Sequence, residues 1–207
     1  MTWICGLLYT QLRDHEGARL RPLVAPMSKG DTQPRYSSYL VTQKDSRYHS
    51  EKDLNGAALA FNEESSFSGY HLLRYYFRES DIRFSRLIES GGHQKSIDLL
   101  NNRKVDIAGI DTTFYDYLSR EKPEEIESLR IIKTIDAFPM PPLLVNDEID
   151  ASVESKLKQC LLALSDDEVG KALLAKHGFT TFVAVDDGYY DSIRNAIVLG
   201  QDLKVLS

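Results

Sequence analysis

The sequence predicts an α/β fold with two lobes, one of which is inserted into the other. In the middle of the chain, short apolar runs alternate with turns rich in glycine and serine and with segments of helical spacing, which is the pattern of repeated strand–loop–helix units. Residues 138–143, Phe-Pro-Met-Pro-Pro-Leu, follow this region. Proline is excluded from helix interiors and central strands, so we expect this segment to be an extended crossing between the lobes.

Composition narrows the classes of function. Of the 207 residues, 42% are hydrophobic and 27% are charged, which is typical of a soluble globular protein. The net charge of −6 and the pI of about 5.4 argue against nucleic acids and anionic membrane surfaces as partners, because both attract positive charge. An anionic ligand would need local dipoles and hydrogen bonds. No run of about 18 apolar residues is present, so no membrane-spanning helix is predicted.

The central lobe is predicted from four apolar strands and the helices that follow three of them. The expected strands cover residues 57–61, 82–89, 105–110 and 129–135. The expected helices are one that contains Leu72, Leu73, Tyr76 and Phe77, one that runs through Leu100, and one that covers residues 112–120. Because these strands are almost wholly apolar, we expect a sheet that is covered on both faces.

The remaining segments are assigned to the other lobe. Residues 1–45 are expected to be strand-like and poor in helix. After the proline-rich segment we expect three helices: one with Val153, Leu157, Cys160, Leu161 and Leu164 on one face, one at 168–176 closed by Gly178, and one with Tyr189, Ile193, Ala196 and Ile197 on one face. The predicted first lobe is therefore discontinuous, residues 1–45 and 137–207, and the predicted second lobe is residues 46–136.

The two cysteines give no metal signal. Cys5 and Cys160 lie far apart in the sequence. Two separate buried thiols are the favoured interpretation, with a single disulfide as the alternative. No Cys/His cluster has the spacing of a structural zinc site. We predict neither a metal nor a cofactor.

Three strand ends in the central lobe predict a binding site. In open α/β sheets, ligands bind beyond the carboxyl ends of the strands, where helices begin with unpaired N–H groups and a partial positive charge. The first such junction contains Ser65, Ser66, Ser68 and Gly69. One serine would be enough to cap a helix. Three hydroxyl groups within four positions therefore favour an anion site over capping alone.

The second and third junctions are each open to a structural interpretation. Gly91 and Gly92 precede His93, which would let the backbone approach a ligand and an imidazole donate to it; a tight turn with a surface histidine is the alternative. Asp111 ends the third strand and is best explained as a helix cap. As a site residue it would accept a hydrogen bond from a protonated or amine-bearing ligand. The other histidines are expected to be surface groups.

Catalysis has less support than binding. The sequence contains no nucleophile elbow, phosphate-binding Walker loop, zinc-protease motif or dinucleotide fingerprint. Ser66, His93 and Asp111 are the residue types of a hydrolytic triad, but residue types without geometry are weak support. We predict that the protein is not an enzyme.

The ordered motifs resemble one known family. Residues 53–70 read D-L-N-G-A-A-L-A-F-N-E-E-S-S-F-S-G-Y, residues 90–97 read S-G-G-H-Q-K-S-I, and residues 105–111 read V-D-I-A-G-I-D. W-I-C-G-L-L-Y at 3–9, R-Y-S-S-Y-L-V-T at 35–42, F-P-M-P-P at 138–142 and the closing G-F-T-T-F and Y-Y-D-S-I also fit. Over nearly the whole chain, this set resembles the phosphate, phosphite and phosphonate solute-binding proteins of ABC transporters.

The resemblance implies a type II periplasmic-binding-protein fold, in which two α/β lobes close on an oxyanion in a cleft, without turnover. It implies a small tetrahedral oxyanion as ligand and an ABC permease as partner. The sequence does not determine the oligomeric state, for which a monomer is favoured. Carried over by motif, the ligand-binding residues would be Tyr9, Ser66, Phe67, Ser68, Gly69, His93 and Asp111. The motifs do not distinguish phosphate, phosphite and phosphonates.

The start of the chain departs from the family pattern. Family members begin with an export signal or lipoprotein anchor and a strand–helix segment before the W-x-C-G-x-x-Y motif, whereas Met1 here falls almost on that motif. We therefore expect a first lobe that is shortened at its N-terminus. The family implies a periplasmic location. The chain as written contains no signal, so we expect a cytoplasmic location if the chain is natural as written, and a truncated product is the alternative. A cytoplasmic small-anion sensor that uses the same cleft is the alternative function.

Overall fold

The described part of the chain, residues 1–206 of a computed structural model, divides into two compact units. Unit 1 comprises Met1–Tyr36 and Phe138–Asn195, and unit 2 comprises Ser37–Ala137 and the chain from Ala196 onward. The division predicted from the sequence placed residues 37–45 and the C-terminal tail in the first lobe. They belong to unit 2 instead, because residues 38–42 pair with the strand at residues 107–111 and the tail is hydrogen-bonded to Phe84. The chain therefore passes between the units three times, where two passages were expected.

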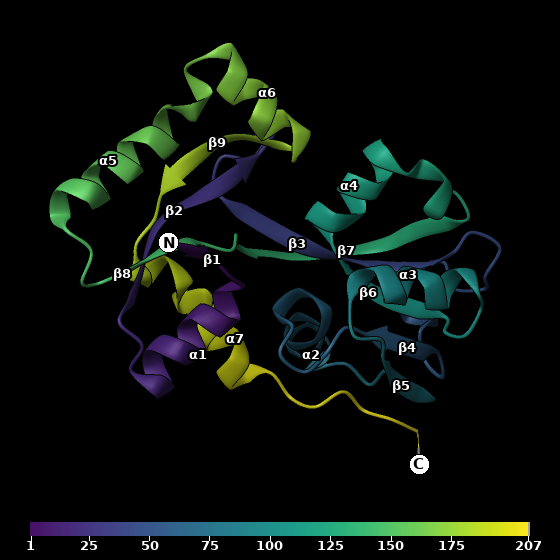
Figure 1. Ribbon diagram of the computed structural model, residues 1–207. Coiled ribbons are helices and arrows are strands. Elements are labelled where there is room, and N and C mark those ends of the chain that lie inside the picture. Colours follow the sequence, from purple (N-terminus) through teal and green to yellow (C-terminus); the bar gives the residue numbers. More distant parts are fainter. Residues whose placement is uncertain (207) are drawn as a thin grey trace. The chain divides into compact units, whose positions relative to one another are not determined.

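Unit 2 is built on a five-stranded mixed sheet (Figure 1). The order of the strands is β5 (Arg86–Glu89), β4 (Ala58–Phe61), β6 (Ile107–Asp111), β3 (Arg35–Gln43) and β7 (Leu129–Pro139). β4 pairs in parallel with β5 on one side and with β6 on the other, and β3 pairs antiparallel with β6. The four predicted strands of the central lobe are confirmed, with β5 shorter and β7 longer than expected.

Helices cover both faces of this sheet, as the apolar strands predicted. The helices are α2 (Leu72–Phe77), α3 (His93–Asn101) and α4 (Thr112–Glu121). Ala108 and Ile110 of β6 belong to the buried cluster that contains residues of α3 and α4. Gly109 faces the opposite side, because side chains alternate along a strand. There a methyl group on Gly109 would lie 2.8 Å from Leu73 of α2, so close packing requires glycine.

Unit 1 contains an antiparallel sheet with helices around it. The order of its strands is β1 (Thr2–Trp3), β8 (Leu143–Asn146), β2 (Leu20–Ser28) and β9 (Phe179–Ala184). Its helices are α1 (Gly6–Glu16), α5 (Ala151–Leu162), α6 (Glu168–Lys176) and α7 (Asp191–Leu199), the last of which continues into unit 2. Short 3₁₀ turns occur at Ala163–Ser165 and Asp187–Tyr190 in unit 1, and at Glu51–Asp53 and Pro123–Glu125 in unit 2.

The sequence-based expectation for the N-terminal region was wrong about helix content. Gly6–Glu16 is helical and ends at Gly17, which has a left-handed φ of 64°. The helix buries Leu7 and Tyr9, and Gly6 lies so close to Ile193 that a methyl group there would be 2.7 Å from that side chain. Tertiary packing of this face stabilises a helix whose hydrophobic pattern is weak.

The other helices of unit 1 follow the prediction in position but not in every contact. α6 has the predicted bounds, and Gly178 follows its end with a φ of 81°. In α5, Leu157 and Leu161 pack on the cluster formed by β2 and β8, but Val153 is 47% exposed. Cys160 is also exposed, so the prediction that both cysteines are buried was wrong; within residues 1–206 both thiols are free.

The C-terminal tail is held by backbone hydrogen bonds within unit 2. Phe84 N donates to Lys204 O over 2.9 Å, and Leu206 N donates to Phe84 O over 2.8 Å. Arg74 forms a 2.9 Å ion pair with Asp202. These bonds explain why the tail belongs to unit 2 although it follows a helix that begins in unit 1.

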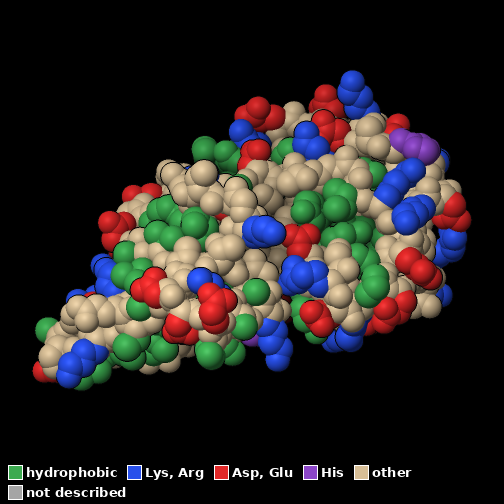
Figure 2. Space-filling model, turned by 90° about the horizontal axis from the view of Figure 1, so that it is seen from above, with side chains coloured by type: hydrophobic (Ala, Val, Ile, Leu, Met, Phe, Trp, Pro, Cys, Tyr) green, Lys and Arg blue, Asp and Glu red, His purple; other side chains and the backbone are tan. Residues whose placement is uncertain are grey.

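The surface mixes charges of both signs. On the face shown in Figure 2, acidic and basic side chains are interspersed among apolar ones. Among residues 1–206, no helix combines the length and the apolar character needed to cross a bilayer.

Replacing Gly170 with alanine is expected to destabilise unit 1. A Cβ atom at this position of α6 would lie 1.8 Å from the carbonyl oxygen of Leu164, which is backbone and cannot rotate away. We expect the free energy of unfolding to fall by about 1–3 kcal/mol or more, as overpacking typically costs. Urea unfolding can be followed through the single tryptophan, Trp3, which packs 6.2 Å from Phe179 between ring centroids.

Gly188→Ala is the matched control, because its Cβ would meet no atom closer than 3.6 Å. Equal free energies of unfolding for the two variants would show that the backbone around Gly170 and Leu164 can move apart to admit a methyl group, which would contradict the prediction.

Candidate functional site

Three loops meet at one edge of the sheet in unit 2. β5, β4 and β6 run parallel, so their carboxyl ends lie at the same edge. The chain leaves β4 for β5 on one side and then crosses to β6 on the other, which makes β4 a topological switch point. Ligands of open α/β sheets bind at such points. The edge therefore gathers the three junctions that the sequence analysis selected.

The first loop begins with a capped π-helical turn. Ser66 precedes the π-helix Phe67–His71, and its Oγ accepts a 3.1 Å hydrogen bond from Gly69 N. The Nδ2 of Asn62 is 3.4 Å from the same oxygen and donates to it. π-helical turns of this kind are frequent at functional sites. Capping and site formation, treated as alternatives for this loop, are compatible in the structure.

Side chains from all three loops converge on Ser68. This serine is only 5% exposed, and its Oγ donates to Asp111 Oδ2 over 3.3 Å. His93 Nε2 lies 3.4 Å from the same Oγ, and Asp111 N donates to His93 Nδ1 over 3.3 Å. These hydrogen bonds are long compared with the usual 2.7–3.0 Å. The three side chains are thus close together without saturating one another.

The order of these bonds differs from that of a hydrolytic triad. A triad needs the carboxylate on the Nδ1 side of the histidine, to orient and stabilise the imidazolium. Here the Nδ1 of His93 accepts from a backbone amide, and the carboxylate of Asp111 contacts the serine instead. Ser66, the serine that the sequence suggested for a triad, bonds to Asn62 and Gly69. The contacts of Ser68, His93 and Asp111 are therefore not those of a hydrolytic triad.

Asp111 is also a helix cap, as the structural interpretation predicted. Its Oδ1 accepts from Thr113 N over 2.7 Å, from Thr113 Oγ1 over 2.6 Å and from Phe114 N over 3.3 Å. Oδ1 is therefore fully engaged by α4. Only Oδ2, which faces Ser68, can accept a hydrogen from a ligand, so capping fixes which oxygen is presented.

Burial keeps His93 in its neutral form. The ring is partly buried and stacks on Phe114 with centroids 5.9 Å apart. Burial lowers the pKa of His93, and the opposing effects of the Asp111 carboxylate and the Gly109 carbonyl are smaller. In the neutral tautomer that accepts at Nδ1, the hydrogen is on Nε2. His93 then presents a donor on the side of Ser68.

The second loop depends on glycine for its backbone. Gly91 and Gly92 have φ values of 81° and 156°, a region that side chains rarely allow. Gly91 N donates to Asn62 O over 2.7 Å, which joins this loop to the end of β4. Ser90 Oγ and Ser96 Oγ are 2.7 Å apart and close the turn on α3. The predicted tight turn is thus present, and it lies at the same edge of the sheet as the first loop.

The expected roles of Phe67 and Gly69 are only partly reflected in their surroundings. The side chain of Phe67 is buried, so any contact with a ligand would come from its backbone. The Gly69 amide already donates to Ser66 Oγ. Gly69 is required for another reason: a Cβ there would lie 2.6 Å from Cγ of Asn62.

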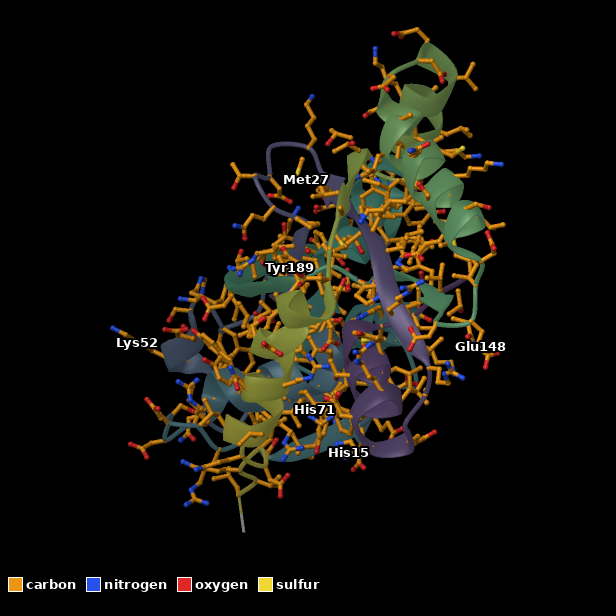
Figure 3. All side chains as sticks on the ribbon, turned by 90° about the vertical axis from the view of Figure 1, so that its left-hand side faces the viewer. His15, Met27, Lys52, His71, Glu148 and Tyr189 are labelled. Carbon is orange, nitrogen blue, oxygen red and sulfur yellow. The ribbon has the colours of Figure 1, made fainter. Side chains whose placement is uncertain are left out.

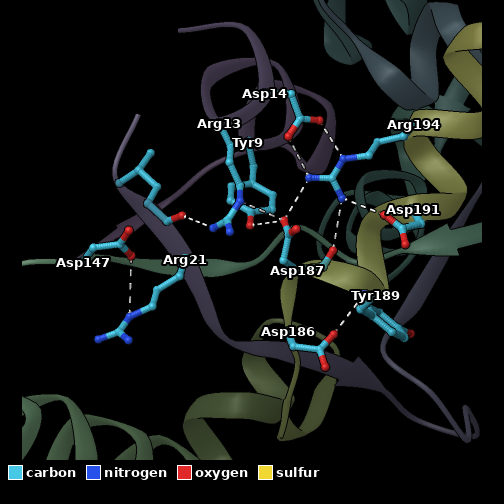
Figure 4. A network of polar contacts seen from close by, with 11 residues as sticks. Tyr9, Arg13, Asp14, Arg21, Asp147, Asp186, Asp187, Tyr189, Asp191 and Arg194 are labelled. Carbon is cyan, nitrogen blue, oxygen red and sulfur yellow. Dashed lines mark hydrogen bonds and ion pairs between the residues drawn. The ribbon is translucent and has the colours of Figure 1, made fainter. Parts of the chain in front are cut away.

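Tyr9 lies in unit 1, in a network of its own (Figure 4). Its hydroxyl donates to Asp187 Oδ1 over 2.5 Å, and its ring is fully buried. Burial, and then the hydrogen bond to Asp187, raise the pKa of Tyr9. Arg194 contacts Asp187, Asp14 and Asp191 at 2.6–2.9 Å. The network holds the hydroxyl of Tyr9 in its protonated form.

The remaining histidines are not all surface groups. His15, His49 and His177 are exposed, and Figure 3 shows His15 near the end of α1. His71 is half-buried, its Nε2 is 2.7 Å from Glu64 O, and burial lowers its pKa. It follows the first loop and was missed because its partner is a backbone carbonyl, which leaves no trace in the sequence.

Asn62 is the residue of this edge that the sequence analysis did not select. It is the first polar residue after the apolar run of β4, and this position at a strand end is the signal that would have identified it. In the part of the chain that the structure describes, no group of three or more histidine, cysteine, aspartate or glutamate side chains is arranged to hold a metal ion.

Comparison with known proteins gives a consistent result. A family described as "ABC transporter, phosphonate, periplasmic substrate-binding protein" matches residues 1–190. The chain belongs to this family. The family resemblance predicted from the motifs is confirmed. The members of the family are described as substrate-binding proteins of transporters.

A curated relative within this family is the phosphonates-binding periplasmic protein of Escherichia coli (strain K12). It is 26% identical over 165 residues, which cover 76% of this chain and 48% of the relative. The chain thus spans about half the length of the curated relative that it matches.

Solved structures of similar fold include three bacterial binding proteins. A component of an ABC phosphonate transporter from Pseudomonas aeruginosa has a TM-score of 0.81 at 23% identity, over 94% of this chain and 66% of that one. A Prochlorococcus marinus protein in complex with methylphosphonate has a TM-score of 0.78 at 18% identity, over 94% and 75%. A Xanthomonas citri protein bound to ATP has a TM-score of 0.71 at 20% identity, over 95% and 75%. The predicted fold class, α/β of the type II periplasmic-binding kind, is confirmed.

Acidification is expected to destabilise the wild-type protein more than His93→Gln. The pKa of His93 in the folded state lies below its unfolded value of about 6.5, so the unfolded chain binds the proton preferentially. The free energy of unfolding therefore falls as the pH drops through about 6.5, and a glutamine at this position, which does not titrate, removes this contribution. Urea unfolding at pH 7.5 and pH 5 measures the difference.

His49→Gln, at an exposed position, is the control and should follow the wild type. An equal loss of stability in wild type and His93→Gln would contradict the description of His93 as a buried neutral group.

Proposed function

We propose that the protein is the solute-binding component of an ABC transporter for a phosphorus oxyanion, and that it binds reversibly without turnover. The observation that carries the proposal is the convergence of Ser68, His93 and Asp111, from three different loops, at the switch point of the sheet. Membership of the phosphonate-binding family supports the choice of ligand class.

The proposed site suits a tetrahedral anion that carries one hydrogen-bond donor. Neutral His93 and the serine hydroxyls would supply donors for oxygens of the anion, with Ser68 exchanging its long hydrogen bond to Asp111 for one to the ligand. Asp111 Oδ2 would repel a fully deprotonated oxygen, so we propose that it faces a protonated oxygen or a substituent with an N–H or O–H group. The acidic net charge of −6 gives no long-range attraction, which makes these local donors decisive.

Other features of the proposal rest on the family alone. Tyr9, Phe67 and Gly69 are proposed as further ligand residues, an ABC permease as the partner and the periplasm as the location. Because a protein of the same fold is described as bound to ATP, a nucleotide is the competing ligand that a binding test must include.

Thermal unfolding against a ligand panel tests the function. The panel contains phosphate, phosphite, methylphosphonate, aminoethylphosphonate, sulfate and ATP. A ligand that binds only the folded state stabilises it by about 2.7 kcal/mol at a hundredfold excess over its Kd. We expect an upward shift with at least one phosphorus anion of the first four, lost in Ser68→Ala and in His93→Ala.

Ser119→Ala is the matched control, since Ser119 is exposed, lies in the last turns of α4, and donates to the carbonyl of Tyr115. It should keep the full shift. A shift with ATP or sulfate alone would replace the proposed ligand class, and no shift with any compound would refute the proposal for this chain.

A further inference from the structure

Asn62 occupies the point where two loops of the proposed site meet. Asn62 is 6% exposed and directly follows β4. Its side chain packs against the backbone of Gly69, where no Cβ would fit, and its backbone oxygen accepts from Gly91 N. One residue therefore touches both the loop after β4 and the loop after β5.

Hydrogen-bond accounting at Ser66 shows what the side chain of Asn62 does. A serine hydroxyl has two acceptor lone pairs and one hydrogen. Ser66 Oγ accepts from Gly69 N over 3.1 Å and from Asn62 Nδ2 over 3.4 Å, which uses both lone pairs. The hydroxyl hydrogen is left to point elsewhere. Asn62 thus makes Ser66 a donor at this edge.

The oxygen of the Asn62 side chain has no hydrogen-bond partner among the described residues in this orientation. Asn62 Oδ1 is buried, and no group among residues 1–206 donates to it. A buried acceptor without a partner is unfavourable and uncommon in folded proteins. If the Asn62 amide were rotated by 180°, its oxygen would accept the Ser66 hydrogen, and that hydrogen would no longer be available to a ligand. The unpaired oxygen is the consequence of the orientation that keeps Ser66 available.

We propose that Asn62 is a positioning residue of the anion site: it directs the Ser66 hydroxyl toward the ligand and fixes the loop of residues 66–69. This inference rests on the proposed function and extends it to a residue that does not itself need to touch the anion. It explains why a buried asparagine, with one oxygen unpaired, stands at the end of an apolar strand.

Asn62→Asp tests the direction of the hydrogen bond. An ionised carboxylate accepts the Ser66 hydrogen and places a negative charge beside the site. At pH 8 we expect the affinity for methylphosphonate to fall about tenfold to a hundredfold, the range for a lost hydrogen bond to a charged group. At pH 5 the gap in affinity to wild type should narrow, because burial at this position raises the pKa of the introduced carboxyl group and its protonated form can donate again. Calorimetric titration of both proteins at each pH measures it.

Asn102→Asp is the matched control, because the same change is made at an exposed residue at the far end of α3. It should bind as the wild type does at both pH values. If Asn62→Asp lowers the affinity for methylphosphonate by the same factor at pH 8 and at pH 5, the proposed direction of the hydrogen bond from Asn62 to Ser66 is wrong.

A double-mutant cycle tests whether Asn62 acts through Ser66. In the wild-type background, Asn62→Ala should weaken methylphosphonate binding. In a Ser66→Ala background the same change should have little further effect, because there is no hydroxyl left to direct. Independent, additive losses would overturn the positioning role.

A measurement without ligand separates this inference from the proposed function. Amide hydrogen exchange of Gly69 should accelerate in Asn62→Ala and not in Asn102→Ala, since Asn62 holds the serine to which that amide donates. If the wild type binds none of the anions, the proposed function fails, and with it the role of Asn62 toward a ligand; the exchange result then decides only whether Asn62 fixes the loop of residues 66–69. Unchanged exchange of Gly69 in Asn62→Ala would overturn it.

Discussion

In unit 2, β4 pairs in parallel with β5 on one side and with β6 on the other. This pairing forces three carboxyl ends to one edge of the sheet, and each is followed by a helix or a π-helical turn. The site residues are far apart in the sequence, and nothing local brings them together. Close packing supports the arrangement, since α2 can approach the sheet only because position 109 is glycine. The geometry of the proposed site thus follows from strand order and from the core beneath it.

At that edge, structural roles and the proposed binding roles fall on the same residues. Asp111 caps α4 with Oδ1, and this leaves Oδ2 toward Ser68. Burial favours neutral His93, and the amide of Asp111 fixes its tautomer. Ser66 caps the π-helical turn and, with Asn62 and Gly69 as donors to it, retains its own hydrogen. Each side chain is oriented by a backbone contact, so the site is organised before a ligand arrives, which reduces the entropy that binding must overcome.

In unit 1, ion pairs orient the side chain of a predicted ligand residue, Tyr9. Arg194 bridges carboxylates from α1 and from the segment around α7, and Asp187 in this network receives the hydroxyl of Tyr9. Although burial opposes it, the hydrogen bonds from Tyr9 and Arg194 lower the pKa of Asp187, so the carboxylate remains ionised. Tyr9, which the family motif at residues 3–9 selected, is therefore held by Asp187 and Arg194, which lie outside the motif.

The sequence by itself determined the α/β class, the apolar strands of unit 2, the bounds of α6 and the three junctions that carry Ser66, Ser68, His93 and Asp111. These features are local: they depend on hydrophobic periodicity, glycine and helix-capping residues within short windows. Only the tertiary structure decided that Gly6–Glu16 is a helix, that the tail joins unit 2, that Cys160 is exposed, and that Asn62 contacts two loops. Those features depend on partners distant in sequence, such as Ile193 against Gly6 and Gly91 against Asn62. Such pairings leave no periodic signal, because the energy that fixes them is gained only when the chain has folded.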